Sequence, residues 1–285
     1  MRAVRASARW LLMAGATLFF AFPLLWMFLT AFKSRVDVFA PVPLFLFTPT
    51  LANFTAALTG TPFPHHLLNS FTAAIASTGL ALLLGAPCAH GFARHGAFRG
   101  ADALFFWVLS LRMLPPVALA VPFYLGFARL GMHDSLGALI LLHAVANTAL
   151  AIWLLKGFFD EVPRELEESA ALEGLRPWKV FLKVSLPLVA PGIAATAVLC
   201  LVTSLNEFLF ALVLTADRAV TAPVGLSNFQ KYFGLEWGQF SAAASLFIAP
   251  LLVFTWAVQP HLIRGFGGGP ATAARPDPVA GRETA

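Results

Sequence analysis

The chain has 285 residues, of which 59% are hydrophobic and only 12% are charged. Soluble domains carry about a quarter charged residues, so this composition excludes an ordinary soluble domain and places most of the chain in a membrane. The formal net charge of +5 does not indicate nucleic-acid binding, because the Lys and Arg residues lie between apolar stretches and do not cluster on a module of their own.

Six apolar stretches are long enough to cross a bilayer as helices, which takes about 20 residues each. They are residues 10–32, 67–93, 103–128, 136–155, 188–216 and 240–263. The first follows three arginines, as a signal peptide would, but it is longer than a secretory apolar region and shows no small-residue cleavage pattern, so we expect a retained anchor. Cys88 and Cys200 fall inside two of the stretches, where we expect buried thiols and no disulfide. The sequence predicts an all-α integral membrane protein with six transmembrane helices.

The basic residues predict the orientation of the spans. With the N-terminus in the cytoplasm, thirteen Lys and Arg residues lie in cytoplasmic segments, five lie outside, and Arg112 lies within a span. The positive-inside rule therefore places both termini in the cytoplasm of a plasma (inner) membrane protein. Residues 1–9 form the cytoplasmic N-terminus and 10–263 the transmembrane domain. Residues 264–285, rich in Gly, Ala and Pro, form a tail that we expect to be disordered.

A long polar segment, residues 157–187, separates the fourth and fifth spans and is cytoplasmic in this orientation. From Asp160 to Glu173 it carries six carboxylates and one cation, whereas residues 174–187 carry three cations and no acid. A helix lying on an anionic leaflet is normally rich in Lys and Arg, so docking on a protein explains the acidic half better. Pro163 suits a first helical turn with Asp160 as its cap, and Gly174 suits a helix end. We expect a helix, a glycine turn and a second short helix.

This segment resembles the EAA loop of ABC importer permeases. Glu168-Ser-Ala, Gly174 and Val184-Ser-Leu-Pro match that family's Glu-Ala-Ala, three residues, Gly, nine residues, Ile-x-Leu-Pro, with Ser169 in place of Ala and Val184 in place of Ile. The resemblance extends over nearly the whole chain. Residues 113–117, 151–155, 206–210 and 222–226 look like the carbohydrate-importer branch, in particular the smaller six-span permease of maltose-type transporters.

The resemblance implies partners and roles. It implies a permease subunit for a sugar, oligosaccharide, polyol or glycerol-phosphate-like solute, paired with a second homologous permease, cytoplasmic ABC ATPase subunits and an extracytoplasmic solute-binding protein in the lipid membrane. ATP and Mg would be bound by the ATPase partner, so no cofactor is expected in this chain. The residues that it implies for coupling to the ATPase are Glu165, Glu168, Ala170, Ala171, Gly174, Leu186 and Pro187. An interfacial helix without a partner is the alternative reading of the segment.

Arg112 lies about nine residues into the third span, at a depth of about 14 Å. A charge at that depth costs at least about 2.5–3.5 kcal/mol, so it should face a cavity or a partner. Pro115 and Pro116 follow, and we expect a helix kinked there, beside a translocation path. A structural kink, with Arg112 paired to another subunit, is the alternative. Pairing of Arg112 with Glu207 is left open.

Other polar residues in the spans extend the candidate translocation path. Asn206 and Glu207 lie in the fifth span, where the resembling family usually has Trp-Asn-Glu and this chain has Leu205. The missing Trp puts a sugar contact at that position in doubt. His143 and Asn147 lie one turn apart on the fourth span, and interhelical hydrogen bonding is the favoured role for both. Such a mid-depth polar pocket suits an uncharged polyhydroxy solute.

Several kinds of chemistry have no motif in this sequence. There is no G-x-x-x-x-G-K-[ST] phosphate loop, no H-E-x-x-H, no G-x-S-x-G and no His or Cys grouping with metal-ligand spacing. We therefore expect a non-enzymatic subunit without a metal. The alternatives are an ion-coupled secondary transporter, for which we find no internal repeat, and an ABC permease for a non-carbohydrate solute.

Overall fold

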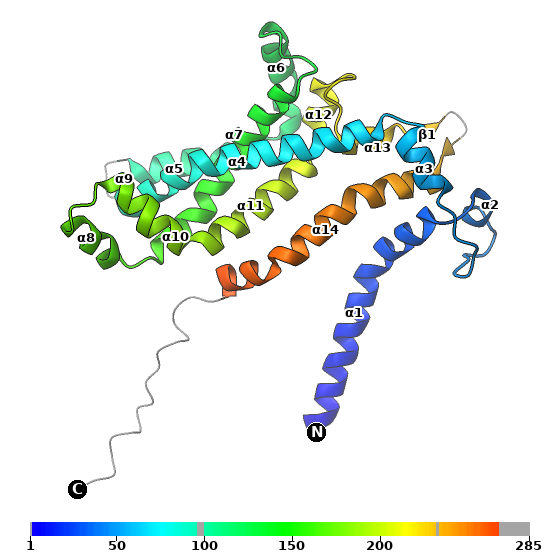
Figure 1. Ribbon diagram of the computed structural model, residues 1–285, viewed down its shortest axis with the longest axis horizontal. Helices are drawn as coiled ribbons and strands as arrows, with labels where there is room; N and C mark the ends of the chain where they lie inside the picture. The colour runs from blue at the N-terminus through cyan, green and yellow to red at the C-terminus, as the bar shows by residue number, and fades with distance from the viewer. Residues whose placement is uncertain (1, 96–99, 232–233, 268–285) are drawn as a thin grey trace. The chain divides into compact units, whose positions relative to one another are not determined.

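The computed structural model describes residues 2–95, 100–231 and 234–267 (Figure 1). The chain divides into two units, Met1–Asn69 with Val220–Leu252, and Ser70–Ala219 with Val253–Ala285. Two long helices, α4 (Phe63–His95) and α14 (Trp237–Gly267), have residues in both units. Most of the tail expected to be disordered, residues 268–285, lies outside the described residues.

The first unit holds the chain's first helix and a group of short elements. These elements are α1 (Arg2–Ala31), α2 (Arg35–Val38), α3 (Ala52–Thr59), α13 (Ala222–Ser227) and the antiparallel strands β1 (Gln230–Lys231) and β2 (Gly234–Leu235). The Asn53 side chain donates to the carbonyls of Ala31 at 2.9 Å and Lys33 at 2.8 Å. The Asn69 amide donates to the Val220 carbonyl at 2.9 Å. These bonds tie α3 to the end of α1, and α4 to the segment before α13.

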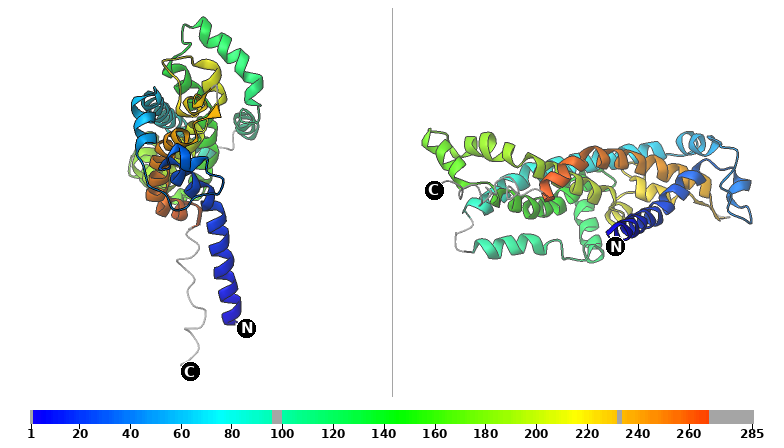
Figure 2. Two further views of the ribbon diagram at one scale, coloured as in Figure 1. Left: turned by 90° about the vertical axis from the view of Figure 1, so that its right-hand side faces the viewer. Right: turned by 90° about the horizontal axis from the view of Figure 1, so that it is seen from below.

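The second unit contains the elements that carry the candidate site. They are α5 (Ala101–Ser110), α6 (Pro116–Arg129), α7 (Leu136–Asp160), α8 (Arg164–Leu172), α9 (Pro177–Val180), the π-helical turn η1 (Phe181–Ser185), α10 (Leu186–Leu188), α11 (Ala190–Leu205) and α12 (Leu209–Leu214). Figures 1 and 2 show α8 and α9 at one end of this unit, and α6 with α12 away from them. Helix α11 packs along α7, and α12 packs on α6.

Small side chains allow α4 and α7 to pack closely in the second unit. The buried cluster along this contact contains Ala86, Ala89, Ala93, Ala151, Leu155, Phe159, Val162 and Val189. A Cβ at Gly85 would lie only 2.8 Å from the Ala151 methyl group. Small residues let helix backbones approach in this way inside a membrane, where van der Waals packing replaces the hydrophobic effect.

Four helices of the described residues are long and apolar enough to cross a membrane. They are Arg9–Ala31, Phe63–Arg94, Leu136–Asp160 and Trp237–Trp256. A fifth crossing results if Pro177–Leu188 and Ala190–Leu205, which are bent by 77° to each other, count as one span. Apart from the two short strands the described elements are helical, so the prediction of an all-α protein with several apolar spans is confirmed.

The structure differs from the sequence-based expectations in local details. The third expected span is two shorter helices, α5 and α6, because tandem prolines at 115 and 116 remove two backbone donors and the chain leaves the helix over residues 111–115. The fifth expected span ends its regular helix at Leu205 and resumes at Leu209. Asp160 does not cap α8: it ends α7, where it accepts a 2.7 Å bond from Lys156. Cys200 is buried as expected, whereas Cys88 is exposed.

Candidate functional site

A cavity of about 450 Å³ lies within the second unit where two of the broken helices face α7. Its walls are the break between α5 and α6, the first half of α7, and the break between α11 and α12. Five of the residues that the sequence predicted for a translocation path line it: Arg112, Pro116, His143, Asn147 and Glu207. Pro115 and Asn206, also predicted, do not line it. A volume in this range is typical of small-molecule sites.

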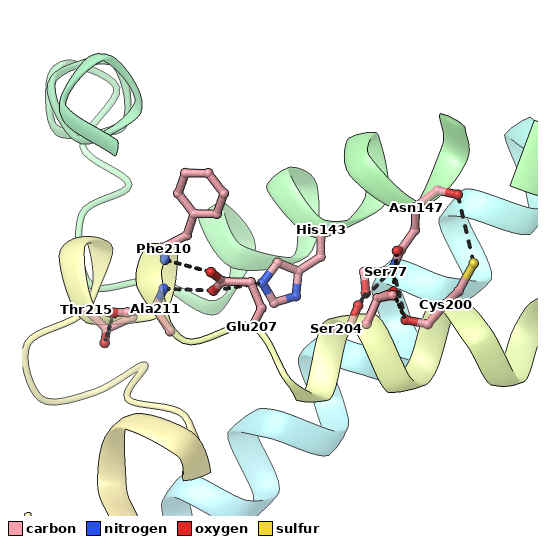
Figure 3. A network of polar contacts seen from close by, with 10 residues as sticks. Ser77, His143, Asn147, Cys200, Ser204, Glu207, Phe210, Ala211 and Thr215 are labelled. Carbon is pink, nitrogen blue, oxygen red and sulfur yellow. Dashed lines mark hydrogen bonds and ion pairs between the residues drawn. The ribbon is translucent and has the colours of Figure 1, made fainter. Parts of the chain in front are cut away.

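Asn147 is the centre of a buried hydrogen-bond network (Figure 3). Its amide donates to the Cys200 carbonyl at 3.1 Å and to the Ser204 hydroxyl at 2.8 Å, and its own carbonyl oxygen accepts from the Thr203 hydroxyl at 2.8 Å. The Ser77 and Ser204 hydroxyls lie 3.0 Å apart. The network joins α7, α11 and α4, so the polar groups of Asn147 are used inside the protein.

Glu207 explains the break between α11 and α12. Its carboxylate accepts from the backbone amides of Phe210 at 2.8 Å and Ala211 at 3.0 Å, in the first turn of α12, where amides have no partner within the helix. Its Oε2 lies 3.6 Å from Nε2 of His143 (Figure 3). No ion pair joins Arg112 to Glu207 in the described structure.

His143 is 4% exposed, and neither ring nitrogen has a hydrogen-bond partner among the described residues. Interhelical hydrogen bonding was expected of His143 and Asn147 together. It occurs at Asn147 and not at His143, because the Glu207 carboxylate is turned to the amides of α12 and stays beyond hydrogen-bond distance of the imidazole.

The polar segment between α7 and α11 forms an elbow, which we define as residues 164–185. Helix α8 ends where the Gly174 amide donates to the Ala171 carbonyl at 2.9 Å and the Leu175 amide to the Ala170 carbonyl at 3.2 Å. Gly174 has φ +89°, and a Cβ there would meet no atom within 4 Å. Glycine is therefore required by the left-handed backbone and not by crowding.

Glu167 fixes the elbow to the rest of the unit, a role that the sequence analysis missed. Its carboxylate accepts from Arg94 Nε at 2.7 Å and from the Ser185 hydroxyl at 2.7 Å, and lies 3.3 Å from Nε2 of His90. Arg94 also donates to the Val162 carbonyl at 2.9 Å. The Glu167 and Arg94 side chains are only 12% and 8% exposed. One carboxylate thus joins α4, α8 and η1.

The surroundings of Glu167 favour its charged form. Burial by itself would raise the pKa of this carboxyl, but the hydrogen bonds from Arg94 and Ser185 and the charges of Arg94 and His90 outweigh it and lower the pKa to about 2. The other acids of α8, Glu165 and Glu168, are exposed.

The remaining residues predicted for coupling lie along the same elbow and just after it. Ala171 and Pro187 are exposed, and Leu186 is half-buried. The predicted set therefore splits into an exposed face of α8 with Glu165, Glu168 and Ala171, and a packed face with Ala170. The side chains of this exposed face are available for contact with another molecule.

Comparison with known proteins identifies the family. Residues 81–266 match the family model described as "Binding-protein-dependent transport system inner membrane component". A probable ABC transporter permease of Sinorhizobium fredii is 38% identical, over 88% of this chain and 90% of the relative. A trehalose transport system permease of Mycobacterium tuberculosis is 33% identical, over 87% of this chain and 90% of the relative.

A solved structure agrees on the fold. A chain of a bacterial ABC transporter involved in the import of the acidic polysaccharide alginate superposes with a TM-score of 0.77 at 19% identity, covering 90% of this chain and 96% of that one. At this identity the likeness concerns the fold. The family match over residues 81–266 and the relatives above 30% identity show that the chain belongs to the binding-protein-dependent transport system inner membrane components, and its apolar helices make it a multi-pass membrane protein.

Proposed function

We propose that this chain is the permease subunit of an ATP-driven importer for a carbohydrate, and that it forms half of the translocation path. The observation that carries the proposal is the cavity of about 450 Å³ at the helix breaks, lined by Arg112, His143, Asn147 and Glu207 in a chain of this family. The carbohydrate assignment is supported by relatives named for the transport of trehalose and of maltose.

Six spans are proposed for the folded protein in the membrane. Helices α1, α4, α7 and α14 each cross alone, α5 and α6 together form a broken third crossing, and α11 with α12 forms the fifth. Both termini are cytoplasmic, because this orientation places thirteen of nineteen Lys and Arg residues in cytoplasmic segments. Discontinuous helices in transporters commonly surround a solute site, since backbone that leaves the helix must line protein or water.

The elbow is proposed as the coupling element. Helix α8 presents Glu165 and Glu168 to the cytoplasm for a basic groove of an ATPase subunit, and Glu167 holds the same helix to α4 and η1. A displacement of α8 by the ATPase would then be transmitted to α4 through the Arg94 bond. In the alternating-access scheme, ATP-driven closure of the ATPases opens the path outward, and hydrolysis restores the inward-facing state.

The assembly that we propose has three kinds of partner. A second homologous permease forms the other half of the path, two ATPase subunits bind ATP and Mg on the cytoplasmic side, and an extracytoplasmic binding protein delivers the solute. The chain itself carries no phosphate-loop motif, so the ATPase site is assigned to the partner and no cofactor to this chain.

Purification of the tagged chain from its native membrane in mild detergent tests this assignment. Recovery of an ATPase with a phosphate loop, a second permease and a sugar-binding protein is expected. A double variant, Glu165→Lys with Glu168→Lys, should lose the ATPase and keep the second permease. Recovery of the chain alone, in a form that transports solute without ATP, would refute the proposal and favour a secondary transporter.

A further inference from the structure

The cavity contains a cation without a counter-ion. Arg112 lies in the break between α5 and α6, is exposed toward the cavity that it lines, and has no ion-pair partner within 4 Å among the described residues. In the six-span arrangement proposed above, Arg112 lies near mid-membrane depth, where an unpaired charge costs at least about 2.5–3.5 kcal/mol. Binding of the guanidinium to an anionic group of a ligand or a partner would offset a cost of this size.

The carboxylate of Glu207, which lines the same cavity, already accepts hydrogen bonds within the protein. Both oxygens of Glu207 accept backbone amide hydrogens from α12, at 2.8 Å and 3.0 Å. The polar atoms of Asn147 are likewise bonded to α11. The carboxylate of Glu207 is therefore held by α12, and Arg112 is the cationic side chain of the cavity wall that remains available to a ligand.

His143 is a second, independent sign of a ligand. It lines the same cavity, is 4% exposed, and has two ring nitrogens without a hydrogen-bond partner among the described residues. Its Nε2 lies 3.6 Å from Glu207 Oε2, beyond hydrogen-bond distance, and a buried polar group left without a hydrogen bond costs about 1–3 kcal/mol. A ligand hydroxyl or anionic oxygen in the cavity would satisfy it. Phe123, Phe127 and Phe210 also line the cavity, and aromatic residues suit the apolar side of a sugar.

We propose that the solute carried through this cavity is an anionic carbohydrate, whose carboxylate, sulfonate or phosphate group binds the guanidinium of Arg112 while a neighbouring oxygen binds His143. The inference rests on the proposed function and narrows it. It differs from the sequence-based expectation of an uncharged solute. A planar guanidinium binds such groups through two parallel hydrogen bonds, which a neutral hydroxymethyl group cannot reproduce.

The test compares sugars that differ in one group. Cellobiose and trehalose are each paired with the uronate analogue in which one hydroxymethyl group is a carboxylate. Binding is measured by calorimetry on the detergent-solubilised complex of this chain with its partner permease and ATPase, without the binding protein, so that the selectivity of the binding protein does not contribute. Each neutral sugar and its uronate have nearly the same size, so a difference reports the charge.

The wild-type complex should bind at least one uronate about 10- to 100-fold more tightly than its neutral parent. Arg112→Gln should remove that preference by lowering the affinity for the uronate much more than the affinity for the neutral sugar. Arg112→Lys should keep part of the preference, because it keeps the charge and loses the two-point geometry. Arg129→Gln is the matched control: Arg129 is exposed at the end of α6, does not line the cavity, and should leave all four affinities unchanged.

The proposal would be overturned by any of three results: equal affinities within both pairs, no binding of any of the four probes, or a preference for the uronate that remains in Arg112→Gln. If the Arg112→Gln complex does not assemble, the salt dependence of binding to the wild-type complex is the test. Raising NaCl from about 0.05 to about 0.5 M must lower the affinity for the uronate and leave the affinity for the neutral sugar unchanged. ATP-driven uptake of neutral sugars without any preference for uronates would sink this inference and leave the importer assignment intact. Absence of an ATPase partner would instead refute the assignment.

Discussion

Glu167→Gln tests the joint between the elbow and α4. The substitution keeps the shape of the side chain and removes the charge that Arg94 and Ser185 bind at 2.7 Å each. Lowering the Glu167 pKa from 4.5 to about 2 corresponds to about 3 kcal/mol of stabilisation by the charged form. Breaking a buried ion pair by removing one partner costs a similar amount, about 3–5 kcal/mol. Two separate routes thus give about 3 kcal/mol for local opening of the elbow.

Hydrogen exchange of the α8 amides, followed by mass spectrometry on the assembled complex, measures this opening. Glu167→Gln should lower their protection roughly 100-fold, since about 1.4 kcal/mol is a factor of ten. Glu173→Gln is the control, because Glu173 is an exposed acid at the end of α8 with no proposed contact to the ATPase, and it should leave protection nearly unchanged. Unchanged protection in Glu167→Gln, or an equal loss in Glu173→Gln, would refute the role given to the Arg94 bond.

The same joint predicts a pH dependence. Because the pKa of Glu167 in the folded protein lies below its ordinary value, the charged side chain stabilises the closed elbow fully above about pH 4.5. This stabilisation is lost as the pH falls toward about 2. The difference in α8 protection between wild type and Glu167→Gln should therefore be constant at neutral pH and fall to less than half near pH 3. A difference that grows as the pH falls would contradict the assignment.

Three further substitutions test other parts of the account. Gly174→Ala should strain the turn at φ +89° by about 1–2 kcal/mol and lower the amount of solute transported per ATP hydrolysed. Gly157→Ala is the control, because Gly157 lies in open space on α7 and the substitution should stabilise that helix. Equal effects of the two variants on thermal stability would contradict the role given to the Gly174 turn. Gly192→Ala places a methyl group against the Phe158 ring and should lower the melting temperature, with recovery in a Phe158→Leu background; no recovery would show that the ring is not the obstacle. The Asp134 carboxylate accepts hydrogen bonds from the four backbone amides of residues 216–219, which hold its pKa well below its usual range. Asp134→Asn keeps a side chain that tolerates φ +53° but weakens these bonds, so hydrogen exchange of the amides at 216–219 should become faster. Unchanged exchange would refute the anchoring role.

The sequence predicted the features that follow from period and composition. Long apolar stretches predicted the four helices that are long enough to cross a membrane, whereas the third and fifth expected spans are broken. Gly174 predicted the left-handed turn that ends α8. The polar residues expected in a common path largely meet in one cavity, because His143 and Asn147 lie one turn apart and helices of this unit pack side by side. Whether that cavity is the solute path stays a prediction until uptake is measured.

The sequence did not predict which charges would be used inside the protein. Glu167, Glu165 and Glu168 look alike along the chain, and only the packing of α8 on α4 shows that Glu167 is the one that meets Arg94. The pairing of Glu207 was also left open, because its partners are backbone amides of α12 that exist only once the helix has broken at residues 206–208. Tertiary contacts of this kind carry no local sequence pattern.

Uptake into proteoliposomes tests the central claim most directly. The complex of this chain, its partner permease and ATPase is reconstituted with ATP enclosed on the ATPase side, and the binding protein with its co-purified carbohydrate is added outside. We predict accumulation of that carbohydrate that requires both ATP and the binding protein, and that stops when the phosphate-loop lysine of the ATPase partner is replaced. Uptake by this chain alone, driven by an ion gradient and indifferent to ATP, would contradict the account.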